Sequence, residues 1–220
     1  MIEGAFVVVE GIDGSGSTTV SERLASHLAG KRRPVHRTCE PSGGPIGALI
    51  RQILAHRVVV PTEWGHASPG WATMALLFAS DRADHLQAEV LPRLRDGVIV
   101  ISDRYDLSSL AYQSATAPAE DPAEAERVCA WIRELNRHAR RPDLTLVLDV
   151  RHEVAAERRK RRGGSAELYD DAELQARLAR AYADAERLLP GDRIVHVDAN
   201  VALDEVVAAS IATLDRLWES

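Results

Sequence analysis

Three glycines and a run of hydroxyl side chains follow a short apolar segment near the start of the chain. The segment at residues 6–9 is Phe-Val-Val-Val, which is typical of a strand buried on both faces. An apolar spacing suited to a helix begins at Val20. This layout predicts a phosphate-binding loop, because glycines let the backbone approach phosphate oxygens and the helix start adds free N–H groups and the positive dipole end. The candidate phosphate-binding residues are Gly11, Gly14, Ser15, Gly16, Ser17, Thr18 and Thr19.

This loop departs from the pattern G-x-x-x-x-G-K-[ST] at one position. Ser17 stands in place of lysine and can donate a hydrogen bond but brings no charge, while Thr18 keeps the hydroxyl that usually binds Mg²⁺. A glycine-rich turn before an ordinary helix is the competing interpretation. The chain has only two lysines. Lys31 lies roughly 20 Å along the first helix and cannot replace the missing charge, whereas Lys160 could.

An aspartate and an arginine follow a second apolar run at residues 98–101. Asp103 ends this predicted strand, at the place of a carboxylate near Mg²⁺ in phosphoryl-transfer enzymes. Arg104 is next to it and could clamp a phosphate. A plain surface ion pair is the alternative for these two residues.

Two further features could bind a nucleotide. Phe78 and Arg82 are spaced i, i+4 on a predicted helix and could hold a planar base by stacking and hydrogen bonding, unless they are a core phenylalanine and a surface arginine. Five consecutive cations at residues 158–162, followed by two glycines, suggest a mobile basic flap. Such a run is usually a solvated face, but here it could supply the charge that Ser17 lacks.

The composition is that of an ordinary globular protein of 220 residues, with 45% hydrophobic and 27% charged residues. The net charge of −6 argues against broad nucleic-acid binding. No leader pattern precedes the first strand and no apolar run is long enough to span a membrane, so we expect a cytoplasmic protein without a membrane partner. Neither Cys39 nor Cys129 lies in a metal-type cluster.

Apolar runs alternate with helical patterns throughout the chain. The predicted strands are residues 5–10, 34–38, 97–102, 143–149 and 193–197. The predicted helices are residues 17–29, 45–56, 71–95, 105–115, 122–136, 152–162, 170–188 and 202–218, and residues 57–70 are expected to be irregular. Such alternation indicates an α/β fold with a parallel sheet and helices on both faces.

Five motifs together resemble the thymidylate kinase family of nucleoside monophosphate kinases. The family's E-G-x-D-G-x-G-K-T-T loop corresponds to residues 10–19, and its R-E-P-G-G-T-P-I-G segment to residues 39–47. Its L-L-F-x-x-D-R helix matches residues 76–82, and its D-R-Y-x-x-S-x-x-A-Y-Q segment is complete at residues 103–113. The strand P-D-L-T-x-x-L-D-V lies at residues 142–150. The order is kept over nearly the whole chain.

This resemblance implies a P-loop kinase fold with a five-stranded parallel sheet, in one domain over residues 1–220 with a short lid at about 158–169. It implies transfer of the ATP γ-phosphoryl group to dTMP, giving dTDP and ADP with Mg²⁺. It also implies a homodimer, to which the helix at 71–95 would contribute.

The resemblance also assigns roles to individual residues. Phe78 would stack on thymine and Arg82 would bond its carbonyl group. Tyr112 would pack under the deoxyribose and disfavour a 2′-hydroxyl, and Asp13 would meet the 3′-hydroxyl. The other assignments are Arg51 and Arg104 for the acceptor phosphate, Asp103 and Thr18 for Mg²⁺, and Ser108, Ser109 and Gln113 for the pocket wall.

Three departures from the family pattern affect charge. Ser17 replaces the loop lysine, Cys39 replaces an arginine, and residues 165–169 replace an Asp-Arg pair and an acidic residue in the lid. Gly14 places the chain with the branch whose lid supplies an arginine that the loop lacks. The lid candidates are Arg158, Lys160 and Arg162.

These departures leave rival functions open. A kinase for another pyrimidine deoxynucleotide, such as a 5-modified dUMP, would fit the same base pocket. A nucleotide-binding pseudokinase would fit Ser17 and the altered lid, although the complete segment at 103–113 argues against it. A nucleic-acid-binding role is a more distant reading because the chain is acidic.

Overall fold

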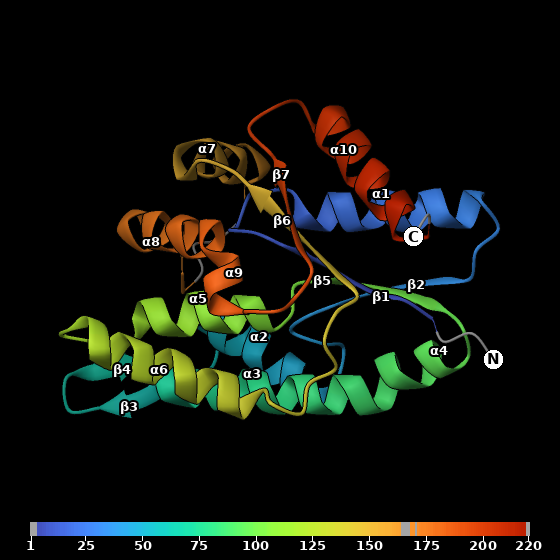
Figure 1. Cartoon of the computed structure of the whole chain (residues 1–220). Helices are drawn as coiled ribbons and strands as arrows, with labels where there is room; N and C mark the ends of the chain where they lie inside the picture. Colours follow the sequence, from blue (N-terminus) through green and yellow to red (C-terminus); the bar gives the residue numbers. More distant parts are fainter. Residues whose placement is uncertain (1–3, 164–167, 170, 219–220) are drawn as a thin grey trace.

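Five parallel strands form the centre of the molecule, as the sequence predicts (Figure 1). The computed structural model describes residues 4–163, 168–169 and 171–218, and of Arg162 only the backbone. The strand order is β2-β5-β1-β6-β7. The bounds are β1 Phe6–Glu10, β2 Val35–Cys39, β5 Ile99–Asp103, β6 Leu144–Asp149 and β7 Ile194–Asp198.

Strand β1 lies in the middle of this sheet, and each of its residues is buried. Its side chains alternate between two cores, as a strand requires. Val7 and Val9 pack in a core with α1, whereas Phe6 and Val8 pack against the segment at 86–94 on the other face. The register pairs Val9 with Asp103, so the glycine loop after β1 and the aspartate at the end of β5 lie at the same edge of the sheet.

Helices cover both faces of the sheet (Figure 1). Helices α1 and α10 lie against one face, and α2 to α6 lie on the other. The bounds are α1 Ser17–Gly30, α2 Pro45–Leu54, α3 Trp71–His85, α4 Leu91–Arg95, α5 Asp106–Thr116, α6 Pro122–Leu135, α7 His152–Arg162, α8 Ala172–Ala183, α9 Ala185–Leu188 and α10 Leu203–Asp215. A 3₁₀ turn, Arg216–Trp218, follows α10.

Three predicted segments need correction. Residues 57–70, expected to be irregular, include the antiparallel hairpin of β3 Val60–Thr62 and β4 Gly65–Ala67, whose strands are too short and too exposed to show a periodic pattern. The helix predicted at 71–95 contains a π-helical turn, Leu86–Val90, between α3 and α4. The helix predicted at 170–188 is interrupted at Asp184, whose N–H is shared between two carbonyl groups.

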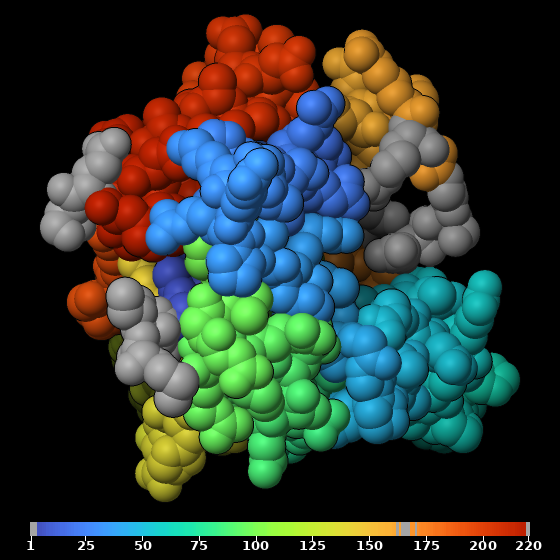
Figure 2. Space-filling model, turned by 90° about the vertical axis from the view of Figure 1, so that its right-hand side faces the viewer, coloured from blue at the N-terminus to red at the C-terminus, as the bar shows by residue number. Residues whose placement is uncertain are grey.

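Strand β2 forms one edge of the sheet. Figure 2 shows the blue segment of α1 and β2 at the surface, between the red C-terminal helix and the green end of α3 and α4. Within the described residues, no helix combines the length and the apolar character needed to cross a membrane.

Candidate active site

The glycine loop leads directly into α1. Gly16, at φ 98°, precedes the first helical residue, Ser17. Gly14, at φ 89°, packs so closely on α7 that an added Cβ would collide with the carbonyl oxygen of Ala155. Because the first turn of a helix leaves its N–H groups without intrahelical acceptors, this end of α1 presents donors that suit an anion.

Thr18 and Asp103 meet at the start of α1. The Thr18 hydroxyl donates to Asp103 Oδ2 at 2.6 Å. The other carboxylate oxygen, Oδ1, is buried and has no hydrogen-bond partner within the described residues. One hydroxyl and one carboxylate with an unused oxygen fit Mg²⁺, which usually keeps several waters and binds through one or two carboxylates plus phosphates. The described residues contain no cluster of three or more acidic, histidine or cysteine ligands.

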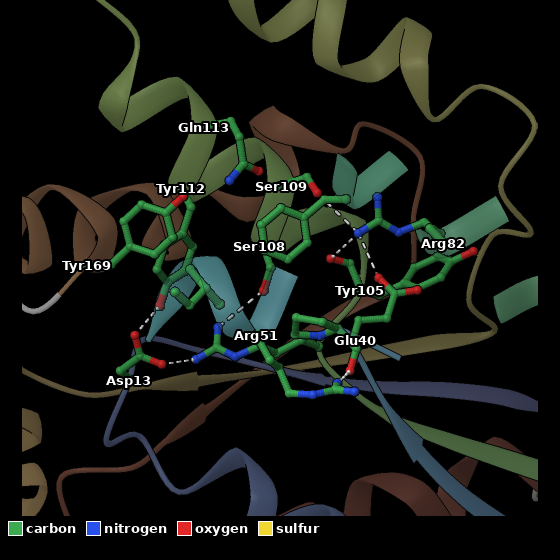
Figure 3. A pocket seen from close by; sticks show the side chains of 14 residues that line it. Asp13, Glu40, Arg51, Arg82, Tyr105, Ser108, Ser109, Tyr112, Gln113 and Tyr169 are labelled. Carbon is green, nitrogen blue, oxygen red and sulfur yellow. Dashed lines mark hydrogen bonds and ion pairs between the residues drawn. The ribbon is translucent and has the colours of Figure 1, made fainter. Parts of the chain in front are cut away.

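A cavity of about 310 Å³ is lined by Asp13 of the glycine loop and by Arg104, which follows Asp103 in the chain (Figure 3). It brings together every residue that the sequence assigned to the acceptor nucleotide: Asp13, Arg51, Phe78, Arg82, Arg104, Ser108, Ser109, Tyr112 and Gln113. The residues come from the glycine loop, α2, α3, the end of β5 and α5. The sequence did not point to five further lining residues, which are Glu40, Pro41, Leu54, Tyr105 and Tyr169.

Arg104 lines this cavity together with Asp13 and Ser108. Its backbone has φ 73°, a conformation that non-glycine residues rarely adopt and that occurs at functional sites. Its guanidinium contacts Asp13 at 2.6 Å and donates to the Gly11 carbonyl at 2.9 Å and to the Tyr182 hydroxyl at 3.2 Å. Burial lowers the pKa of Arg104, but the surrounding tyrosines and carboxylates raise it further, so the arginine remains charged.

A buried carboxylate, Glu10, is linked to Arg104 through the hydroxyl groups of Ser108 and Tyr182, which contact both residues. Glu10 is fully buried at the end of β1 and accepts from the Ser108 hydroxyl at 2.7 Å and the Tyr105 N–H at 2.8 Å. Burial raises the pKa of Glu10, while the charge of Arg104 and the hydrogen bonds lower it in part. Tyr182, on α8, donates to Glu10 at 3.1 Å, which connects the helix after the lid to the cavity floor.

Arg82 forms the opposite wall, and only 1% of its surface is exposed. Its Nη1 donates to Asn136 at 2.5 Å, and its Nη2 donates to the Tyr105 carbonyl at 3.0 Å and the Ser109 hydroxyl at 3.1 Å. Nη2 also lies 2.7 Å from Glu40 Oε2 as an ion pair. The remaining donor, Nε, is buried and has no partner among the described groups.

Aromatic rings and an amide enclose the rest of the cavity. Tyr112 donates to Asp13 Oδ2 at 2.9 Å and meets the ring of Tyr169 edge to face, with centroids 5.1 Å apart. Burial raises the pKa of Tyr169 to about 12, and a hydrogen bond with Gln113 partly opposes that rise. Gln113 Oε1 is buried without a partner among the described atoms, so an acceptor is left for a ligand.

The basic run lies in the last turns of α7, as the predicted helix at 152–162 requires. Arg158 donates to the Ser15 carbonyl at 3.5 Å and to the Val201 carbonyl at 3.2 Å. Arg159, which the sequence did not single out, donates to the Asp13 carbonyl and to Gln175 at 3.4 Å. Two arginines of α7 therefore contact the glycine loop itself.

The other predicted lid cations are placed differently. Lys160 is exposed on α7. The side chain of Arg162 lies outside the described residues, as do lid residues 164–167. Lys31 pairs with Asp215 at 2.8 Å at the far end of α1, which confirms that it cannot serve the loop.

A second cavity, of about 300 Å³, adjoins the glycine loop. It is lined by Gly14, Ser15, Gly16, Thr19, Arg158, Arg159, Val201, Ala202, Leu203 and Val206. The segment at 201–203, between β7 and α10, was not predicted to take part. The apolar side chains of Val201 and Leu203 are exposed there in the structure, which the sequence alone did not indicate.

Comparison with known proteins identifies the family. A sequence model of the family described as "Thymidylate kinase" matches residues 9–210. The chain is 38% identical to a "Probable thymidylate kinase" of Pyrobaculum calidifontis, over 98% of each chain. It is 36% identical to a "Probable thymidylate kinase" of Pyrococcus horikoshii, over 91% of each chain, and 36% identical to a "Thymidylate kinase" of Pelotomaculum thermopropionicum, over 94% of this chain and 96% of the other. The chain belongs to the thymidylate kinase family.

Proposed function

We propose that this chain transfers the γ-phosphoryl group of ATP to dTMP, giving dTDP and ADP. The observation that carries the proposal is the cavity in which all nine predicted acceptor residues, Asp13 of the glycine loop among them, line one space. Phosphoryl transfer requires alignment and neutralised oxygen charge rather than covalent chemistry by the protein. A nucleotide pocket that ends at the phosphate loop supplies that alignment.

The acceptor base would lie between Phe78 and the wall formed by Arg82 and Gln113. Among the described residues, Arg82 Nε is a buried donor without an acceptor and Gln113 Oε1 is a buried acceptor without a donor. This pair matches a pyrimidine that offers a carbonyl oxygen and an N3–H group, which thymine and uracil do and cytosine does not. Cytosine also offers an acceptor, at N3, and a donor, at its N4 amino group, so the choice of dTMP over dCMP is supported by the family and not by this pair.

The acceptor sugar and phosphate would extend toward Asp13 and the two arginines. The Tyr112 ring would pack under the deoxyribose and Asp13 would take its 3′-hydroxyl. Arg104 and Arg51 line the same cavity and would hold the acceptor phosphate. Arg51 already donates to the carbonyls of Pro41 and Ser42, at 2.8 and 2.7 Å, which fixes its direction.

The donor would occupy the second cavity. Its triphosphate would lie on the loop residues, from Gly11 to Thr19, beside Arg158, and the adenine would lie against the segment at 201–203. Mg²⁺ would be held by Thr18 and Asp103, where it would neutralise charge on the phosphate oxygens. The lid at about 158–169 would close over this side in the single domain.

Arginines of α7 would replace the charge that Ser17 lacks. Arg158 and Arg159 are within hydrogen-bonding distance of loop carbonyls, so their guanidinium groups lie at the phosphate end of the donor cavity. Losing one positioned donor at a developing charge typically reduces the rate by about 10²–10³. Lys160 and Arg162 would extend the same basic lid.

The family assignment does not favour the rival functions of a pseudokinase, a nucleic-acid binder or a kinase for a modified nucleotide. We also propose that the chain forms a homodimer and that it acts in the cytoplasm. Leu76 of α3 is 49% exposed, which supports a helical interface that includes α3.

A coupled assay of ADP release tests the proposed function. It uses ATP, Mg²⁺ and each of dTMP, dUMP, dCMP, dGMP and UMP. We expect turnover mainly with dTMP, weaker turnover with dUMP and little with the others. Binding of dTMP without any turnover would overturn the assignment as an active kinase, and a preference for another nucleotide would overturn the acceptor.

A further inference from the structure

A line of alternating acidic and basic side chains runs from the acceptor cavity to the edge of the sheet. Arg82 lines the cavity and pairs with Glu40 at 2.7 Å. Glu40 Oε1 lies 3.3 Å from His85 Nδ1, and His85 Nε2 lies 3.8 Å from Glu89. Glu89 in turn lies 2.5 Å from His36 Nε2 on edge strand β2. These four contacts connect Arg82 with His36 in succession.

His85 stands in the middle of the line and is completely buried in its side chain. It lies one helical turn after Arg82 on α3, so the two side chains share a face. Its second nitrogen, Nε2, lies 2.8 Å from the Thr38 hydroxyl of β2. The imidazole thus has one contact toward the cavity, through Nδ1, and a separate contact toward the sheet, through Nε2.

Glu40 contacts both Arg82 and His85. Its carboxylate is buried, with 3% of the side chain exposed. Oε2 forms the ion pair with Arg82 Nη2 at 2.7 Å. Oε1 contacts His85 Nδ1. A buried carboxylate requires hydrogen-bond donors, so the Nδ1 contact restricts the direction in which Glu40 holds the guanidinium of Arg82.

We propose that His85 is a positioning residue for the acceptor base, acting through Nδ1 on Glu40 and through Glu40 on Arg82. The proposal rests on the base site described above. His85 itself touches no nucleotide. Its loss would therefore raise the KM for dTMP and leave the KM for ATP and kcat nearly unchanged.

Two amide replacements separate this role from simple packing. The amide nitrogen of asparagine can lie near the place of Nδ1, whereas that of glutamine reaches the place of Nε2. His85→Asn therefore keeps a donor toward Glu40, and His85→Gln keeps one only toward Thr38. A merely structural role, in which His85 ties α3 to β2 through Thr38, predicts the opposite ranking.

The test measures the KM for dTMP, the KM for ATP, kcat and the thermal midpoint of the full-length chain. We expect His85→Gln to raise the KM for dTMP about tenfold, which is the effect of roughly one lost buried hydrogen bond. We expect His85→Asn and Thr38→Val to stay within about threefold of the natural protein. His27→Gln is the matched control, because His27 pairs with Asp215 at 3.2 Å on the other face of the sheet.

Equal effects of the two amide variants, or an effect of Thr38→Val as large as that of His85→Gln, would overturn the proposal. A parallel rise in the KM for ATP would also overturn it. The variant Arg82→Met shows which hypothesis is wrong, the positioning role of His85 or the location of the acceptor base beside Arg82. If Arg82→Met raises the KM for dTMP and His85→Gln does not, only the positioning role is wrong. If neither variant changes it, the base site is wrong as well.

A second measurement requires no substitution. Imidazole ¹⁵N NMR of the natural protein should show a shift of the His85 Nδ1 signal when dTMP is added and none when ATP is added. A His85 spectrum that dTMP leaves unchanged would contradict the proposal, even if the His85 variants fail to fold.

Discussion

Ser17 leaves the phosphate-binding loop without a positive charge of its own, and two arginines of α7 contact the carbonyl groups of that loop. The sequence predicted that Arg158, Lys160 and Arg162 of the lid would compensate, whereas the arginines in contact with the loop are Arg158 and Arg159. Helical geometry decides this, because consecutive residues point about 100° apart. Arg158 and Arg159 turn toward the loop, whereas Lys160 and Arg161 are exposed.

We therefore expect Arg158→Gln and Arg159→Gln each to lower kcat by about 10²–10³ and to change the KM for dTMP less than threefold. Ser17→Lys should raise kcat less than tenfold, because the site already contains cations. Steady-state kinetics with saturating Mg²⁺ measure these effects. The matched control is Arg161→Gln, whose arginine pairs with Glu157 at 2.5 Å on the exposed side of α7. Unchanged kcat in both loop-facing variants would contradict the account.

A second prediction concerns Mg²⁺ binding by the carboxylate of Asp103. Its unpartnered Oδ1 should bind Mg²⁺, so Asp103→Asn should lower kcat by about 10²–10³ and raise the Mg²⁺ concentration needed for half-maximal rate. A magnesium titration of the rate measures both quantities. An Asp103→Asn variant with the natural magnesium dependence would exclude the carboxylate from the metal site.

Among the elements, the glycine loop and α7 are packed directly against each other. Gly14 has no room for a side chain because of the Ala155 carbonyl, and Arg159 Cγ would lie 3.1 Å from an added Cβ. Gly16 also has a positive φ but open space around it. The two glycines thus differ in surroundings while sharing a left-handed backbone.

Gly14→Ala should displace α7 and raise the KM for ATP at least tenfold. Gly16→Ala is the comparison within the same loop, since it adds backbone strain of about 1–2 kcal/mol but no collision with α7. Kinetics and the thermal midpoint of both variants measure the difference. If Gly16→Ala raises the KM for ATP as much as Gly14→Ala does, the contact with α7 is not the cause.

Strands β6 and β7 carry a pH-sensitive pair at residues 149 and 196. Burial lowers the pKa of His196, but its hydrogen bond with Asp149, the Asp149 charge and Glu186 together raise it. A raised pKa in the folded state means that protonated His196 stabilises the fold below about pH 6.5, and that this contribution is lost as the pH rises through the folded value.

His196→Gln should therefore lower the thermal midpoint by about 1–3 °C at about pH 5.5 and by less at pH 9. Calorimetry or circular dichroism at both values measures the difference. An equal loss at both pH values would show that packing rather than charge accounts for the effect.

The sequence predicted all five strands of the sheet, because buried parallel strands are apolar runs bounded by loops. It did not predict the hairpin β3–β4, whose exposed residues lack a periodic pattern. It also did not show the break at Asp184, since Ala183, Asp184 and Ala185 continue a helical pattern. Glu40 and Tyr105 were missed in the cavity because their roles depend on contacts between distant segments, such as Glu40 with His85 and Arg82.

For the molecule as a whole, the two cavities adjoin the same glycine loop, since Asp13 lines the first and Gly14, Ser15 and Gly16 line the second. Ligands bind at the carboxyl edge of the sheet in open α/β folds. We therefore propose that the two cavities are halves of one transfer site. The donor would lie on the side of α7 and the acceptor on the side of α3.

A further prediction concerns the proposed homodimer. Leu76→Glu places a charge on the exposed face of α3 and should convert the proposed homodimer into a monomer, as measured by light scattering coupled to gel filtration. Ala208→Glu, on an exposed position of α10, is the control and should leave the mass unchanged. A natural protein that is already monomeric at micromolar concentration would contradict the homodimer.

The most direct measurement is inhibition by adenosine and thymidine joined through five phosphates, because this molecule is long enough to carry both nucleosides with the phosphates between them. We expect this inhibitor to compete both with ATP and with dTMP and to bind more tightly than either substrate, since one molecule would fill both cavities. Competition with only one substrate, or affinity no better than that of dTMP alone, would contradict the claim that the two cavities form a single site of phosphoryl transfer.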